Sequence, residues 1–142
     1  MESYKFTYPI QVRYADLDPQ WHVNNSRYLS FLEAARVTYL KELGLWDGKD
    51  FMHLGLIVAN ININYIKPIT LGQNIIIGLK VTRLGNKSID FSYSIWDMET
   101  EEVLSTATTV MVTYSYEALS AVPIFDLWRK NIAEFEGIPE KS

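Results

Sequence analysis

The stretch DLDPQWHVNNSRY, residues 16–28, divides the first part of the chain into two different sequence patterns. Residues 6–15 before it are β-branched and aromatic with rough alternation, which predicts a strand. From Ser26 onwards, apolar residues recur at steps of three and four, which predicts a helix of about 18 residues that ends at Gly44. We therefore expect the polar stretch to carry the chain from a strand into a long helix.

The second half of the chain is expected to hold four more strands, because β-branched runs there are separated by turn residues. These runs lie near residues 55–66, 73–84, 88–98 and 102–115. The gaps between them are short, so neighbouring strands should be antiparallel. After Pro123, apolar residues step as in a short amphipathic helix. This order predicts an α+β fold in two layers, with one long helix against a five-stranded antiparallel sheet and a short C-terminal helix.

The composition is that of an ordinary globular protein, with 142 residues, 48% hydrophobic and 21% charged side chains. We expect a single domain over residues 1–142, since this length can bury a core. No apolar run reaches the ~18 residues that a membrane span needs, and the N-terminus lacks the pattern of a signal peptide. The absence of cysteine excludes disulfides, thiolate nucleophiles and cysteine metal sites. We expect a cytoplasmic protein with no membrane partner.

Charge is distributed unevenly along the chain. The net charge of −4 argues against nucleic-acid binding, which needs a basic face. Residues 51–89 contain no acidic side chain but four basic ones, Lys67, Lys80, Arg83 and Lys87, so the rest of the chain carries −8. Two interpretations stay open here: an ordinary strand-rich segment, or a local site for an anionic ligand on an acidic protein.

The polar stretch before the helix can carry acyl-transfer chemistry. Backbone N–H groups at a helix start are unpaired and lie at the positive end of the helix dipole, so they can stabilise an oxyanion. Asp18 can act beside them as a base or a nucleophile, and His22 and Asn24 can polarise a substrate or position water. The stretch can therefore supply an attacking group and an oxyanion donor together.

Structural roles compete with this interpretation. Asp16 and Asn24 are residue types that commonly cap helices, and Pro19 suits a turn. The pair Asp16 and Asp18 supplies fewer oxygen ligands than a divalent cation usually takes, so we expect no metal site. A Ser-His-Asp triad stays open, because its members meet only in space.

The same stretch resembles a known family. The pattern D-x-D-P-x-x-x-V-x-x-x-x-Y before a long helix resembles the 4-hydroxybenzoyl-CoA thioesterase family of hotdog-fold acyl-CoA thioesterases. The H-V-N-N core, residues 22–25, also resembles fatty acyl-ACP thioesterases. Further segments fit in register, up to about residue 115: VRYADLD, FLEAAR, NYIKPITLG and RLGNKS. Many H-V-N-N members carry Gly at the position of Trp21, and the plant acyl-ACP enzymes carry Asn at that of Gln20.

The resemblance implies a hotdog fold, in which a five-stranded antiparallel sheet wraps around the long helix, and a homodimer or homotetramer with active sites between subunits. It implies an acyl-CoA thioesterase that needs no cofactor beyond the coenzyme A of its substrate. Asp18 would be nucleophile or general base, and the backbone N–H of Asn25 would hold the thioester oxygen. His22, with Asn24 beside it, would orient water or polarise the carbonyl.

A coenzyme A substrate would also explain the basic segment. Its phosphates need cations, so we expect Arg83, Lys87 and Ser88, around the Gly85-Asn86 turn, to contact them. The alternative is an ordinary solvated hairpin. Two other functions stay open: an acyl-ACP thioesterase, whose acidic partner would bind Arg83 and Lys87, and a hotdog protein that binds acyl-CoA without cleaving it.

Overall fold

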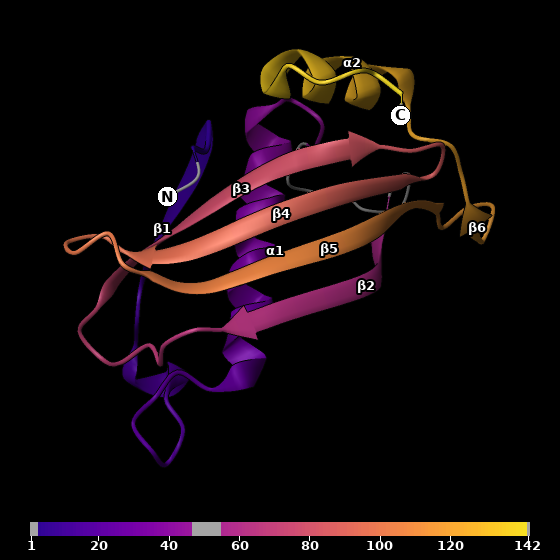
Figure 1. Ribbon diagram of the computed structural model, residues 1–142. Coiled ribbons are helices and arrows are strands. Elements are labelled where there is room, and N and C mark those ends of the chain that lie inside the picture. Colours follow the sequence, from indigo (N-terminus) through magenta and orange to yellow (C-terminus); the bar gives the residue numbers. More distant parts are fainter. Residues whose placement is uncertain (1–2, 47–54, 142) are drawn as a thin grey trace.

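The computed structural model describes residues 3–46 and 55–141 (Figure 1). Its elements follow the order strand, long helix, strands and short helix. They are β1 (Phe6–Gln11), the 3-10 turn η1 (Tyr14–Asp16), α1 (Asn25–Glu42), β2 (Gly55–Tyr65), β3 (Asn74–Leu84), β4 (Ser88–Asp97), β5 (Val103–Ser115), β6 (Ser120–Ala121) and α2 (Asp126–Glu136). The predicted α+β fold is confirmed, with five long strands and a two-residue β6 that pairs with the end of β5.

The sheet is antiparallel throughout and has the strand order β1-β3-β4-β5-β2. Figure 1 shows it curving across α1, with α2 at one end of the helix. β1 lies at an edge, which explains how it tolerates Pro9, a residue without an N–H. The expected first strand, residues 6–15, is too long: β1 ends at Gln11, because Asp16 accepts a hydrogen bond from the backbone N–H of Arg13 and holds the chain in η1.

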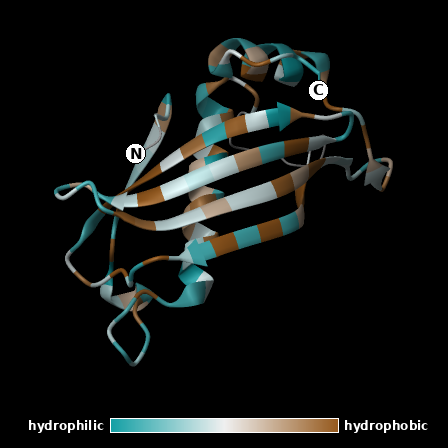
Figure 2. Ribbon diagram, in the orientation of Figure 1, coloured by the Kyte–Doolittle hydropathy of each residue, from teal (hydrophilic) through white to brown (hydrophobic). Residues whose placement is uncertain are grey.

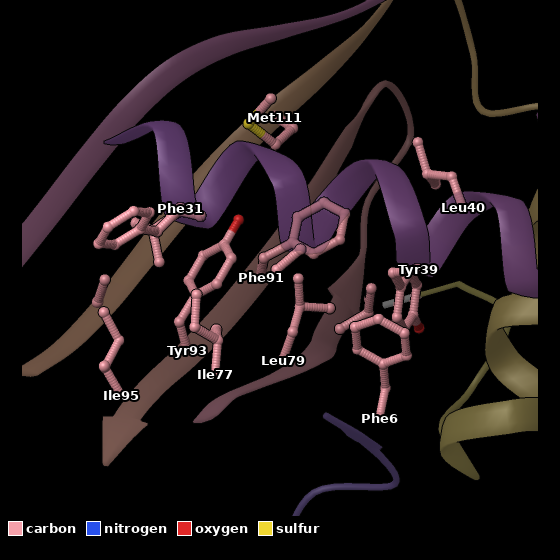
Figure 3. Close-up of a cluster of buried hydrophobic side chains, with 14 of the residues drawn as sticks. Phe6, Phe31, Tyr39, Leu40, Ile77, Leu79, Phe91, Tyr93, Ile95 and Met111 are labelled. Atoms are coloured by element: carbon pink, nitrogen blue, oxygen red, sulfur yellow. The ribbon is translucent and has the colours of Figure 1, made fainter. Parts of the chain in front are cut away.

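The core lies between α1 and the concave face of the sheet. Apolar residues at helical spacing bury one side of α1, and alternate residues of the strands meet them. Figure 3 shows Phe31 and Tyr39 of α1 packed among Ile77, Leu79 and Phe91 of the sheet. The Tyr39 ring contacts the Phe91 ring edge-on, with centroids 6.1 Å apart. Burying one side chain of this size contributes about 1.5–3 kcal/mol, so this layer holds the helix in place.

A buried polar chain crosses the same interface. Arg36 of α1 is 8% exposed, and its Nη1 donates to the Tyr93 hydroxyl at 3.1 Å. That hydroxyl also shares a hydrogen bond of 2.9 Å with the hydroxyl of Thr109 on β5. Burial raises the pKa of Tyr93, against an opposing effect of the Arg36 charge, so the phenol stays protonated. The chain of bonds fixes α1 against β4 and β5.

A second polar contact holds α2 at the C-terminal end of α1. Glu136 accepts hydrogen bonds from the Tyr39 hydroxyl at 2.7 Å and from the Val81 N–H at 2.9 Å. The Val81 amide lies beside the irregularity in the β3–β4 register, where its N–H needs another acceptor. Burial and the Glu136 carboxylate raise the pKa of Tyr39. One carboxylate thus joins two helices and a strand.

The outer strand β2 alternates in hydropathy, as Figure 2 shows by its brown and teal bands. Asn60, Asn62 and Asn64 are exposed, while Ile61 and Ile63 are half-buried, because successive side chains of a strand point to opposite faces of the sheet. Within residues 3–46 and 55–141, no helix is both long and apolar enough to cross a membrane.

Candidate active site

The loop before α1 is a tight hairpin that ends at Asp18 and His22. The Asp18 N–H donates to the His22 carbonyl at 2.8 Å, and the Trp21 N–H donates to the Asp18 carbonyl at 3.0 Å. Trp21 has φ +65°, the left-handed conformation with which such three-residue loops close. A bridge from His22 to Thr70 then fixes the hairpin beside the segment that leads into β3.

The Asp18 carboxylate is oriented by the backbone of its own loop. Its Oδ1 accepts from the N–H of Gln20 at 2.8 Å and from the N–H of His22 at 3.3 Å. Its Oδ2 accepts no hydrogen bond from any residue that the structure describes. Asp18 is half-buried, so the second oxygen is available to a water molecule or a substrate while the first is held.

Asn24 and Asp16 have structural partners. The Asn24 Oδ1 accepts from both the N–H and the hydroxyl of Ser26 at 2.9 Å, which makes it the N-cap of α1. Asp16 is fully buried and lies 3.3 Å from Arg13 Nη2 and 3.6 Å from Arg27 Nε. Its carbonyl accepts the Asn24 N–H at 2.8 Å. These bonds fix the loop on the helix, and the Asn24 side chain is engaged there rather than in the neighbouring hollow.

A hollow of about 380 Å³ opens beside the loop, and we call it the carboxylate hollow. The loop and the first turn of α1 form one wall, and the end of β2 with the following turn forms the other. Its lining residues are Asp18, Gln20, His22, Val23, Asn25, Tyr28, Tyr65, Ile66, Lys67 and Pro68. Three of the four residues predicted as catalytic, Asp18, His22 and Asn25, therefore meet in one place.

Asn25 is the first residue of α1, so its N–H has no carbonyl four residues back within the helix. No acceptor bonds this N–H within the described part of the chain. The N–H lies at the positive end of the helix dipole, and Asn25 is one of the residues that line the carboxylate hollow. The arrangement can stabilise a negatively charged oxygen close to Asp18.

Two tyrosines in this hollow were not predicted as site residues. Tyr28 and Tyr65 pack edge to face with ring centroids 4.9 Å apart. Burial, with the neighbouring Tyr65, raises the pKa of Tyr28, so its hydroxyl stays protonated at neutral pH. Tyr28 is the last residue of the motif, but the apolar periodicity of the helix assigned it to the core. Tyr65 and Lys67 come from the segment NYIKPITLG, and no local pattern places that segment beside the loop.

The predicted phosphate-binding residues lie elsewhere. Arg83, Lys87 and Ser88 belong to the β3–β4 hairpin, at the opposite end of these strands from the loop of residues 18–22 (Figure 1). At about 3.3 Å per residue, the length of β3 separates them from the carboxylate hollow by roughly 30 Å. Within one chain the two groups do not form one site, and the role of the hairpin in binding coenzyme A stays a prediction.

No group of three His, Asp or Glu side chains that could hold a metal ion occurs among the residues described. The cation at the rim of the carboxylate hollow is Lys67, whose Nζ lies 2.6 Å from Glu102 Oε2. The carboxylate hollow brings together the Asp18 carboxylate, the His22 imidazole, the protonated phenol of Tyr28 and the helix-start residue Asn25, with the Lys67 ammonium paired to Glu102.

Comparison with known proteins gives a consistent result. Residues 12–132 match the family model of the thioesterase-like superfamily. Over 79 residues, 56% of this chain, the sequence is 39% identical to the long-chain acyl-CoA thioesterase FadM of Escherichia coli; the match spans 60% of that relative, a little over half of its length. Over 72% of this chain it is 29% identical to the acyl-CoA thioesterase YbgC of Haemophilus influenzae, of which 76% is covered.

Solved structures agree with the sequence matches. A thioesterase from Thermus thermophilus, crystallised with coenzyme A and Zn, superimposes with a TM-score of 0.82 at 28% identity. The superposition covers 98% of this chain and all of the Thermus chain. The predicted hotdog fold is thereby confirmed, while the narrower resemblance to the 4-hydroxybenzoyl-CoA thioesterase family stays a prediction.

Proposed function

The chain belongs to the thioesterase-like superfamily, and from this we propose that it is an acyl-CoA thioesterase, which hydrolyses a thioester to a free acid and coenzyme A. The observation that carries this proposal is that one hollow is lined by both Asp18 and Asn25, the helix-start residue whose N–H has no acceptor among the described residues. A thioesterase needs a group that activates the attack on the carbonyl carbon and a donor to the carbonyl oxygen, and the hairpin and α1 supply one each.

In the proposed reaction the thioester oxygen accepts the N–H of Asn25, and Asp18 Oδ2 takes a proton from a water molecule. The water oxygen bonds to the carbonyl carbon, the carbon–sulfur bond breaks, and the proton passes to the departing thiolate. Alternatively, an Asp18 oxygen bonds to the carbonyl carbon and the thiolate leaves; water then hydrolyses the resulting anhydride to the free acid and the Asp18 carboxylate, and the proton released neutralises the thiolate. His22 lies in the lining, where it can orient the water in either route.

Pairing with a second copy of the chain affects how the coenzyme A part of the substrate can be bound. β2 is the last strand of the sheet and pairs with β5 on one side; its other edge pairs with no strand among the described residues and can accept a second chain. The proposed homodimer, or a homotetramer built from it, would use this edge. Arg83 and Lys87 can reach a carboxylate hollow only from a second chain, because they lie at the far end of β3 in their own. Their proposed contacts with phosphates therefore depend on assembly.

Release of free thiol tests the proposal. The wild-type protein is mixed with short, medium, long and aromatic acyl-CoAs and, separately, with acyl carrier protein thioesters. Steady thiol release from at least one acyl-CoA is expected. Release from the carrier protein alone, weakened by salt and by Arg83→Ala, would replace acyl-CoA by acyl-ACP as the substrate. Tight binding without any release would instead make this chain an acyl-CoA binding protein.

A further inference from the structure

Trp21 is an unexpected residue at its position. Its φ of +65° lies in the left-handed region, which side chains with a Cβ rarely adopt and glycine adopts without strain. The loop would therefore close more easily with glycine. Trp21 is nevertheless present, and 59% of its surface is exposed, so burial in the core of this chain does not account for the indole. Strain of this kind is a reason to look for a role.

The Trp21 indole is part of an exposed aromatic pair. Tyr14, in η1, is 70% exposed and packs edge to face on the indole, with ring centroids 5.8 Å apart. The two residues line a second hollow of about 330 Å³, which we call the aromatic hollow. It is lined by Tyr14, Leu17, Asp18, Pro19 and Trp21. Apart from Asp18, each of these side chains is apolar or aromatic.

Asp18 lines both hollows, so a group bound to a carbonyl beside Asp18 can enter either of them. The carboxylate hollow offers polar partners such as Gln20, His22 and Lys67, which suit the amides of a pantetheine arm. The aromatic hollow offers apolar surface, which suits a hydrocarbon chain. The two arms of a thioester differ in the same way, one being polar and the other apolar.

We propose that Trp21 and Tyr14 form the wall of the acyl-group subsite and that Trp21 sets the preference for acyl-chain length. This inference rests on the proposed thioesterase function. Stacked against the indole, the first methylenes of the acyl chain leave water. Each buried methylene raises the affinity roughly fourfold. If removal of the indole exposes about two methylenes to water, the affinity should fall roughly tenfold or more.

Trp21→Gly is the direct test, because glycine suits the backbone and removes the indole alone. Leu119→Gly is the matched control: Leu119 has φ +55° and is 74% exposed, but it lies in the β5–β6 turn, outside both hollows. The first readout is kcat/KM for straight-chain acyl-CoAs of two to twelve carbons. The second is the affinity for S-alkyl-CoA thioethers of the same lengths, which cannot be hydrolysed.

Trp21→Gly is expected to remain folded. Its kcat/KM should no longer rise with acyl-chain length, so that the ratio of medium-chain to short-chain kcat/KM falls about tenfold. Leu119→Gly is expected to keep the wild-type ratio. An unchanged ratio and unchanged thioether affinities in Trp21→Gly would overturn the inference. So would a change in oligomeric state without a change in ratio, since the indole would then be a subunit contact. If no thioester is hydrolysed, a loss of thioether affinity in Trp21→Gly still supports the subsite and rejects only the hydrolysis.

Discussion

Asn24 allows a sharp separation of a structural from a catalytic role, because serine can replace it as a helix cap. Its Oδ1 accepts two hydrogen bonds from Ser26, both at 2.9 Å. The bond from the backbone N–H satisfies one of the unpaired donors of α1, whereas the bond from the exposed hydroxyl competes with water. Asn24→Ala is therefore expected to lower the free energy of unfolding by about 1 kcal/mol, and Asn24→Ser by only a few tenths.

Urea denaturation, followed by circular dichroism, measures this difference, and the melting temperature of Asn24→Ala should fall by about 3–5 °C. Turnover is measured in parallel on the best acyl-CoA. Because the Asn24 side chain is engaged at the helix start, Asn24→Ser should keep kcat within about twofold of wild type. The kcat of Asn24→Ala should fall somewhat further, since fraying of the first turn of α1 displaces the N–H of Asn25.

A purely structural role for Asn24 would be excluded by an Asn24→Ser protein that unfolds like wild type but has turnover lowered by roughly 10². The amide would then act in the reaction itself, as the sequence motif suggested, and the cap would be secondary. Equal stability of Asn24→Ala and wild type would refute the cap.

Two further predictions concern stability. Tyr93→Phe leaves the buried Arg36 guanidinium without the hydroxyl that accepts its hydrogen bond at 3.1 Å. The free energy of unfolding, measured by urea titration, should fall by about 1–3 kcal/mol. A fall of less than about 0.3 kcal/mol would show that water replaces the phenol as acceptor. The pKa of Asp97 is lowered by the N–H groups of Thr100 and Glu99, so its contribution to stability should be complete above the ordinary value of 3.8 and disappear as pH falls below it. Unfolding of Asp97→Ala and wild type, compared at pH 7 and pH 3, should differ more at pH 7, and an equal difference at both would count against this contact.

The sequence predicted most of the fold because its turn signals are local. The strands 73–84 and 88–98 were placed within one residue of β3 and β4, since Gly85 and Asn86 define the turn between them. The first strand was extended too far, because alternation continues through residues where Asp16 bends the backbone. Such a side-chain contact leaves no periodic signal.

The sequence predicted those site residues that lie close together along the chain. Asp18, His22 and Asn25 lie within eight residues of one another, so one motif contained them and one loop brings them together. Tyr65 and Lys67 reach the same hollow through the pairing of β2 with β5, which no local pattern encodes. The basic residues Arg83 and Lys87 were linked to the site by charge alone, and charge does not say at which end of a strand a residue lies.

Asp18, held by its own loop, is proposed to activate the attacking group. The most direct test compares kcat of Asp18→Asn with wild type on the best acyl-CoA, with Asp90→Asn as a control for the loss of one negative charge on β4. Asp18→Asn should fold and bind substrate normally, and turnover should fall by roughly 10²–10⁴, while Asp90→Asn stays near wild type. Turnover by Asp18→Asn within a few-fold of wild type would contradict the account.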